Sequence, residues 1–176
     1  MKKVVAILFL SLATAVVAQD AYTLTPESVL TIAGSSTVHD WTVTANTMQG
    51  NLTTTNALPA KIDFSVPVAD ILSERGPTMD SKMHAALKIE EHPKVSFKLI
   101  EVRGNTVLVG VLNIAGTEKE VTINVKVVAT GDVFEIQGEK KILLQDFGME
   151  PPTAMFGQIV VGDEVTVNFD LFFKKG

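Results

Sequence analysis

The stretch TMDSKMHAALKIEEHPKVSFKLIEV, Thr78–Val102, changes its hydrophobic period at Pro93. Before the proline, apolar residues recur at helical spacing; after it they alternate with polar residues, as in a strand with one buried face. Because proline disfavours helical geometry in the residue before it, the helix is expected to stop at this point. The stretch therefore predicts one short amphipathic helix, Met79–Glu91, with Thr78 as its N-cap, followed at once by a strand.

Alternation of apolar and polar residues continues through most of the chain after residue 20. The segment AKIDFSVPVADI, residues 60–71, and the closing segment DEVTVNFDLFF both place their apolar residues on one face. Gly104-Asn105 lies between two such segments and predicts a hairpin. The stretch Ser28–Thr54 is rich in Thr and Val and broken by glycines, so we interpret it as one or two strands with a kink.

Such short strands, roughly eight in number and joined mostly by tight turns, predict an all-β fold with an antiparallel sheet. Each strand has one apolar face, so the sheet must cover that face. An eight-stranded antiparallel barrel with the short helix between strands does so and also removes free strand edges. A two-sheet sandwich is the competing interpretation.

The N-terminus is typical of a signal peptide. Two lysines precede the apolar run Val4–Ala13, and the small residues Val16 and Ala18 fit a cleavage site after Ala18. We therefore predict a signal peptide at residues 1–18 and one domain at residues 19–176, exported to the periplasm, with secretion less favoured. The remaining chain contains no apolar run long enough to span a bilayer, so no stable membrane insertion is expected after cleavage.

Composition excludes several classes of partner and chemistry. The formal net charge of -5 argues against a nucleic-acid partner, which would require a basic surface. The chain has no cysteine, so its stability must come from a packed core rather than from disulfides. No nucleophile elbow or H-E-x-x-H motif is present. An enzyme or metal site built on His39, His84 and His92 remains an alternative, although these residues lack a recognised ligand spacing.

The barrel interior is expected to be strongly apolar. Phenylalanines lie on the inward faces, and several methionines lie outside the strands, where flexible thioethers suit an apolar ligand. Ordinary core packing explains the same residues, so a filled structural barrel also remains open. The residues concerned are Phe64, Phe97, Phe134, Phe169, Met79, Met83, Met149 and Met155.

Four segments resemble the YceI-like family of bacterial exported proteins: GSSTVHDWTVTA, MDSKMHAALKIEEHPKVSFKL, GVLNIAGTEKEVTINVKV and LLQDFGM. The second segment, in which an acidic residue opens a helix and H-P-x-V-x-F leads into a strand, is the most specific. The resemblance implies a lipocalin-like barrel that binds a long-chain isoprenoid lipid, such as a polyisoprenoid or an isoprenoid quinone. It implies storage or transport, with a stress-related setting considered, rather than catalysis.

This resemblance also implies a set of ligand-binding residues. The headgroup would lie at the barrel mouth, near Arg75 and His84, and the helix would cap that mouth. No cofactor and no metal are expected besides the bound lipid, and the sequence leaves the oligomeric state open, a homodimer included. The predicted tunnel-lining residues are Phe64, Val66, Met79, Met83, Leu87, Phe97, Leu112, Phe147 and Phe169.

Overall fold

The computed structural model of the chain describes residues 19–154 and 156–176, so the predicted signal peptide and Met155 lie outside the described residues. Besides strands it contains helix α1 (Pro77–Ala86) and the short 3-10 helices η1 (Val68–Asp70) and η2 (Leu144–Phe147). The strands in chain order are β1 (Gln19–Leu24), β2 (Val29–Ser36), β3 (Asp40–Ala45), β4 (Gln49–Thr55), β5 (Leu58–Pro67), β6 (Ile71–Ser73), β7 (Lys94–Arg103), β8 (Val107–Ile114), β9 (Thr117–Thr130), β10 (Val133–Leu143), β11 (Thr153–Ala154) and β12 (Ile159–Lys175).

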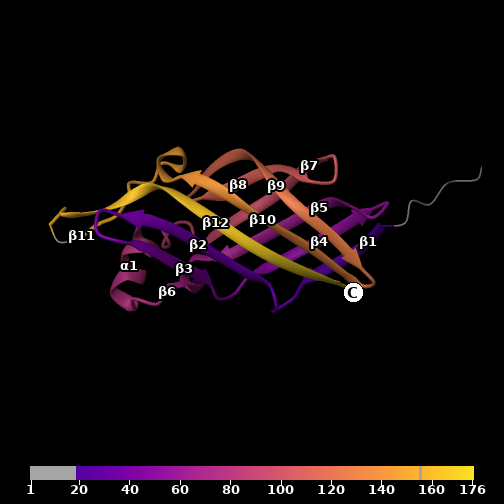
Figure 1. Ribbon diagram of the computed structural model, residues 1–176, viewed down its shortest axis with the longest axis horizontal. Helices are drawn as coiled ribbons and strands as arrows, with labels where there is room; N and C mark the ends of the chain where they lie inside the picture. The colour runs from indigo at the N-terminus through magenta and orange to yellow at the C-terminus, as the bar shows by residue number, and fades with distance from the viewer. Residues whose placement is uncertain (1–18, 155) are drawn as a thin grey trace, which may run out of the picture.

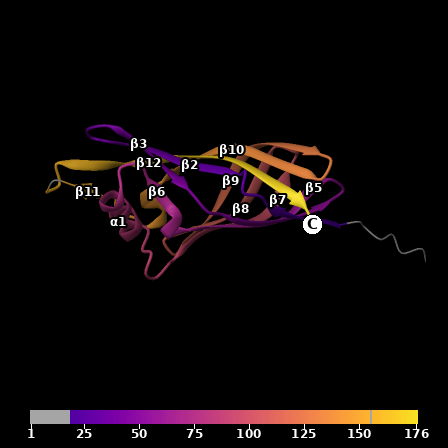
Figure 2. The same cartoon turned by 90° about the horizontal axis from the view of Figure 1, so that it is seen from below.

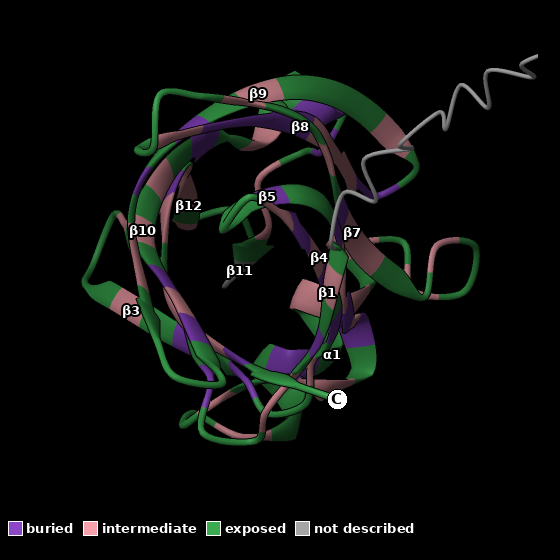
Figure 3. Ribbon diagram, turned by 90° about the vertical axis from the view of Figure 1, so that its right-hand side faces the viewer, coloured by how far each residue is buried: buried purple, intermediate pink, exposed green. Residues whose placement is uncertain are grey.

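Eight of these strands form a closed antiparallel barrel, in the order β1, β4, β5, β7, β8, β9, β10 and β12. The ring closes where β1 pairs with β12, with Tyr22 opposite Lys175 and Leu24 opposite Phe173. Figure 3 looks along the barrel and shows the strands arranged around it. The predicted eight-stranded antiparallel barrel is therefore confirmed, and each strand of the ring has two neighbours, which removes the free edges of an open sheet.

Strands β2, β3 and β6 extend the wall beyond the ring at one end (Figure 1). β2 pairs with β12, with Leu30 opposite Phe169; β3 pairs with β2, and β6 pairs with β3. The stretch Ser28–Thr54 thus contributes to three strands rather than one or two. Strand β1 was not predicted, because Tyr22 is its one buried residue and its alternation is correspondingly weak.

Helix α1 lies at this same end, beside β6 (Figures 1 and 2). Its N-cap is Gly76 rather than the predicted Thr78, and Pro77 takes the first helical position, which its fixed φ suits. The helix ends at Ala86, not at the predicted Glu91, since Lys88 adopts a left-handed backbone with φ of 56°. The prediction relied on the proline further along, whereas a left-handed lysine ends a helix without a comparable mark in the sequence.

The barrel interior is packed with side chains at the end away from α1, where β1 pairs with the end of β12 (Figure 1). The side chains of Leu52 and Phe134 are 1% exposed, and the rings of Tyr22 and Phe134 are in tilted contact with their centroids 5.8 Å apart. We call Tyr22, Leu52 and Phe134 the plug. No helix in residues 19–154 and 156–176 has the length and apolar character needed to span a membrane.

Candidate functional site

A cavity of about 590 Å³ lies inside the barrel, between the plug and helix α1. It is lined mainly by apolar side chains from the inward faces of the strands. On β12, the alternate residues Val165, Val167, Phe169, Leu171 and Phe173 all face it. This is the arrangement that a strand with one face inside a barrel requires, because successive side chains point to opposite faces.

The cavity meets solvent at the end that carries α1 and β11, which we call the mouth. The lining residues that are exposed all come from the turn between β2 and β3, the start of β3, the α1 segment, or β11. These residues are His39, Thr42, Arg75, Met79, Lys82 and Thr153. The plug closes the opposite end, so the cavity is a tube with one solvent-facing end.

All but one of the predicted tunnel residues line this cavity: Phe64, Val66, Met79, Met83, Leu87, Phe97, Leu112 and Phe169. Phe147 is the exception. It lies in η2, is 3% exposed, and packs in a cluster with Ile142 and Val165. The 3-10 turn interrupts the strand alternation that would have aimed its ring inward. Ligand binding by these residues stays a prediction.

Helix α1 turns one face toward the cavity. Met79, Lys82, Met83 and Ala86 line it at the spacing of neighbouring helical turns. The helix is fastened to β6 by the buried carboxylate of Asp80, which accepts a hydrogen bond of 2.8 Å from the backbone N–H of Ser73. This bond links the helix to β6 at the mouth.

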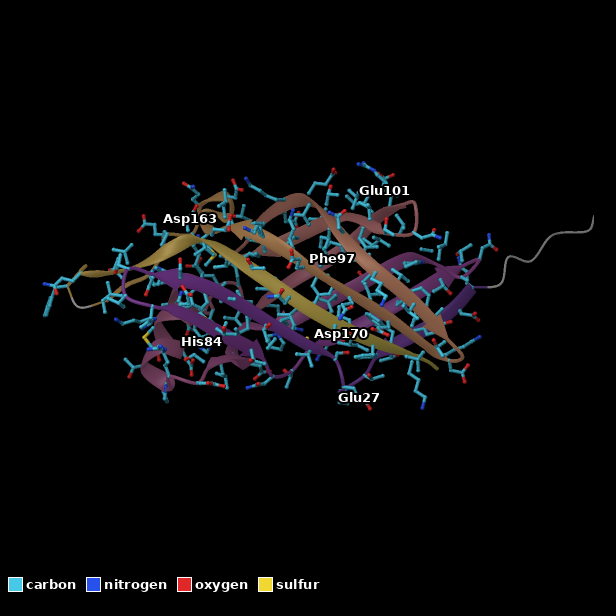
Figure 4. The ribbon with its side chains drawn as sticks, in the orientation of Figure 1. Glu27, His84, Phe97, Glu101, Asp163 and Asp170 are labelled. Carbon is cyan, nitrogen blue, oxygen red and sulfur yellow. The ribbon has the colours of Figure 1, made fainter. Side chains whose placement is uncertain are left out.

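The two predicted headgroup residues lie in different places. Arg75 lines the cavity at the mouth. His84 does not line it: its Nε2 lies 2.8 Å from the carbonyl oxygen of Ile71, so its ring contacts β6. Figure 4 shows His84 at the α1 end of the barrel and Phe97 farther along it. Helical spacing turns His84 away from the face that carries Met79 and Met83.

Lys140 and Trp41 are two of the cavity residues that were not predicted from the sequence. Lys140 lines the cavity among apolar residues of β10, and its inward position follows the same alternation as Phe134, Ile136 and Ile142. Trp41 also lines the cavity, and its indole N–H donates a hydrogen bond of 3.0 Å to the carbonyl of Ser35. The alternation of β10 could have identified Lys140.

The three histidines do not form a common site. His39 is exposed at the mouth, and His84 contacts Ile71. His92 packs against Gly116 so closely that a Cβ there would overlap the imidazole. Within the described residues no group of three or more His, Cys, Asp or Glu side chains could hold a metal ion. The structure therefore does not bring together the residues on which the metal or enzyme hypothesis rested.

Three groups with shifted pKa values lie outside the cavity. A hydrogen bond with the side chain of Thr25, followed by one within its own backbone, lowers the pKa of Glu27. Hydrogen bonds raise the pKa of Lys141, whose partner is Glu164, and of Lys175, whose partner is Asp20. These are ordinary surface contacts and say nothing about chemistry inside the barrel.

The fold and the cavity define a closed antiparallel β-barrel with an apolar interior that opens at one end. The sequence matches the YceI-like domain over residues 22–173, and the chain belongs to this family. No curated protein sequence matches the chain.

Solved structures with the same fold share little sequence with it. BcnA of Burkholderia cenocepacia is 20% identical, with a TM-score of 0.66, and the match covers 83% of this chain and 96% of that one. A polyisoprenoid binding domain from Saccharophagus degradans is 15% identical, with a TM-score of 0.70 and coverage of 89% and 99%. The YCEI protein of Campylobacter jejuni is 16% identical, with a TM-score of 0.57 and coverage of 99% and 93%.

Proposed function

We propose that this chain binds one long apolar chain, of the polyisoprenoid class, inside the barrel and stores or carries it in the periplasm. The observation that carries this proposal is the apolar cavity of about 590 Å³, closed at one end and open at the other. The name of the Saccharophagus degradans neighbour, a polyisoprenoid binding domain, supports the choice of ligand class. A cavity lined mainly by apolar side chains suits binding better than catalysis.

The volume gives the size of the ligand. A cavity of about 150 Å³ accommodates benzene, so each ligand carbon requires about 25 Å³ of cavity volume. On this scale, the cavity of about 590 Å³ holds about 24 carbons, or about five isoprene units.

Burial of the chain is enough to drive binding. At about 0.8 kcal/mol per carbon, such a chain gains roughly 19 kcal/mol. Association costs about 4–15 kcal/mol, so tight binding needs few polar contacts. Selectivity then depends on chain length and on whatever group lies at the polar end.

Extraction of the purified protein tests this function. Untagged protein isolated from the periplasm should yield, by organic extraction and mass spectrometry, about one isoprenoid chain per folded chain, the number that the barrel cavity accommodates. Protein that yields no lipid and takes up no added geranylgeraniol would refute the proposal and favour a filled structural barrel.

Export is part of the proposal and has its own test. The expected cleavage after Ala18 places Gln19 at the start of the mature chain. N-terminal sequencing of periplasmic protein should therefore begin at Gln19. Protein that keeps Met1 and is found in the membrane fraction would contradict the periplasmic assignment.

A further inference from the structure

The charged side chains that line the cavity are all basic. They are Arg75, Lys82 and Lys140, joined by His39. The whole chain, in contrast, has 20 acidic residues and 15 lysines and arginines, yet none of the acidic residues in the described ranges lines the cavity. A neutral hydrocarbon ligand gives no reason for this bias.

Lys140 is half-buried, whereas the other members of this set are exposed. It follows Phe134 and Ile136 on the inward face of β10 and precedes Ile142, all three of which are buried. On the neighbouring strand it lies opposite Val167, another cavity residue. Lys140 itself is half-buried, so its aliphatic stem lies beside these apolar side chains while its ammonium makes a hydrogen bond at an exposed part of the wall.

Lys140 lies just beyond the end of the ladder between β9 and β10. β9 and β10 pair only as far as Val125 opposite Gly138, whereas β10 continues to pair with β12 up to Leu143 opposite Glu164. Beyond the end of this ladder, Lys140 Nζ donates an exposed hydrogen bond of 3.0 Å to the carbonyl oxygen of Thr122 on β9. The lysine therefore bridges these two strands beyond their ladder.

This bridge leaves the charge of Lys140 without an anionic partner. The ammonium has three donors, and the carbonyl of Thr122 uses one of them. None of the ion pairs found in the described part of the chain includes Lys140. Its outward neighbour Lys141 differs, since its Nζ lies 2.8 Å from the carboxylate of Glu164.

We propose that the bound lipid is acidic, and that Lys140 is the residue that recognises its carboxylate or phosphate group. This inference rests on the proposed function and adds the chemical class of the ligand. An oxyanion at the cavity wall would accept charge-assisted hydrogen bonds from the remaining donors of Lys140. A ligand with a neutral alcohol at the same position lacks the charge.

A matched pair of probes tests the proposal: geranylgeranoic acid and geranylgeraniol, which carry the same isoprenoid chain. The delipidated wild-type protein should bind the acid about ten- to a hundredfold more tightly at pH 8, the range of a charge-assisted hydrogen bond. Lys140→Gln keeps a hydrogen-bond donor and removes the charge. It should therefore abolish the preference for the acid and leave the affinity for the alcohol unchanged. Lys140→Arg should restore most of the preference.

Two further variants control for the position of the charge. Lys141→Gln removes one charge from the adjacent, outward-facing residue and should leave the preference unchanged. The double variant Arg75→Met/Lys82→Met removes both cations of the mouth and should also retain most of it. Circular dichroism and thermal melting confirm that each variant is folded, and Lys140→Arg provides the comparison if Lys140→Gln is unstable.

The outcomes separate this inference from the proposed function. Equal affinity of wild type for acid and alcohol overturns the acidic ligand and leaves the lipid-binding function standing. A preference that disappears in the mouth double variant but persists in Lys140→Gln overturns the assignment to Lys140. Binding of neither probe refutes the proposed function itself.

Discussion

The same substitution, Phe→Ala, made separately at Phe64 and at Phe134 distinguishes the cavity from ordinary core. Phe134 belongs to the plug and is 1% exposed, whereas Phe64 is half-buried and lines the cavity. Phe→Ala at either position removes a benzene-sized group, or about 150 Å³. The chemical change is the same at both positions, so any difference in the lost free energy of unfolding reflects the surroundings of each ring.

The magnitudes follow from those surroundings. At Phe134 the substitution leaves an enclosed void, and the lost transfer free energy together with this void costs about 3–5 kcal/mol. At Phe64 one side of the ring already faces the cavity and has no packing partner to lose, so about 1–2 kcal/mol is expected. The removed ring also enlarges the cavity enough for about six more carbons, or about one isoprene unit.

Urea unfolding of the delipidated proteins measures both costs, with unchanged m-values as the check that the unfolding reaction is comparable. Binding of isoprenoid alcohols of increasing length should show an optimum about one unit longer in Phe64→Ala than in wild type. Equal destabilisation by the two substitutions, with no change in the preferred length, would show that the interior at Phe64 is packed core and would refute the cavity.

Three other predictions follow from the same geometry. In the wild-type protein, the affinity for isoprenoid alcohols should rise with chain length up to about five units and then level off. Competition with a fluorescent fatty acid measures this affinity, and a steady rise beyond about five units would contradict the closed end. Met83→Asp should reduce lipid copurified per folded chain sharply, since it places a charge in the cavity lining, whereas Ala85→Asp on the exposed face should not. Asp80→Ala should lower the free energy of unfolding by about 1–3 kcal/mol, since it leaves the Ser73 N–H without its acceptor. A loss under about 0.5 kcal/mol in urea unfolding would mean that this hydrogen bond does not hold α1 in place.

The barrel was predictable because alternation is a local property of each strand. Val165, Val167 and Phe169 repeat every second residue, and this alone identifies the face that the sheet must bury. The same rule placed Phe64 and Phe97 correctly on the inside. Closure followed from the count of strands and from the need to remove free edges.

The parts that escaped prediction depend on how elements meet in space. Alternation assigns Lys140 to the inner face, but only the register between β9 and β10 shows that their ladder stops beside it. Helical spacing groups His84 with α1, but only the position of β6 determines that its ring reaches the carbonyl of Ile71. Phe147 falls in a 3-10 turn, where neither period applies.

The plug has a kinetic consequence for any cargo. With Tyr22, Leu52 and Phe134 sealing the far end, a long molecule cannot thread through the protein and must back out along the path by which it came in. Binding and dissociation then follow the same path in opposite directions. A longer ligand dissociates more slowly, and it must also insert farther into the cavity before it is fully bound. Delivery to a membrane or to another protein would require the α1 end to face the acceptor, so the direction of hand-over is built into a tube with a single opening.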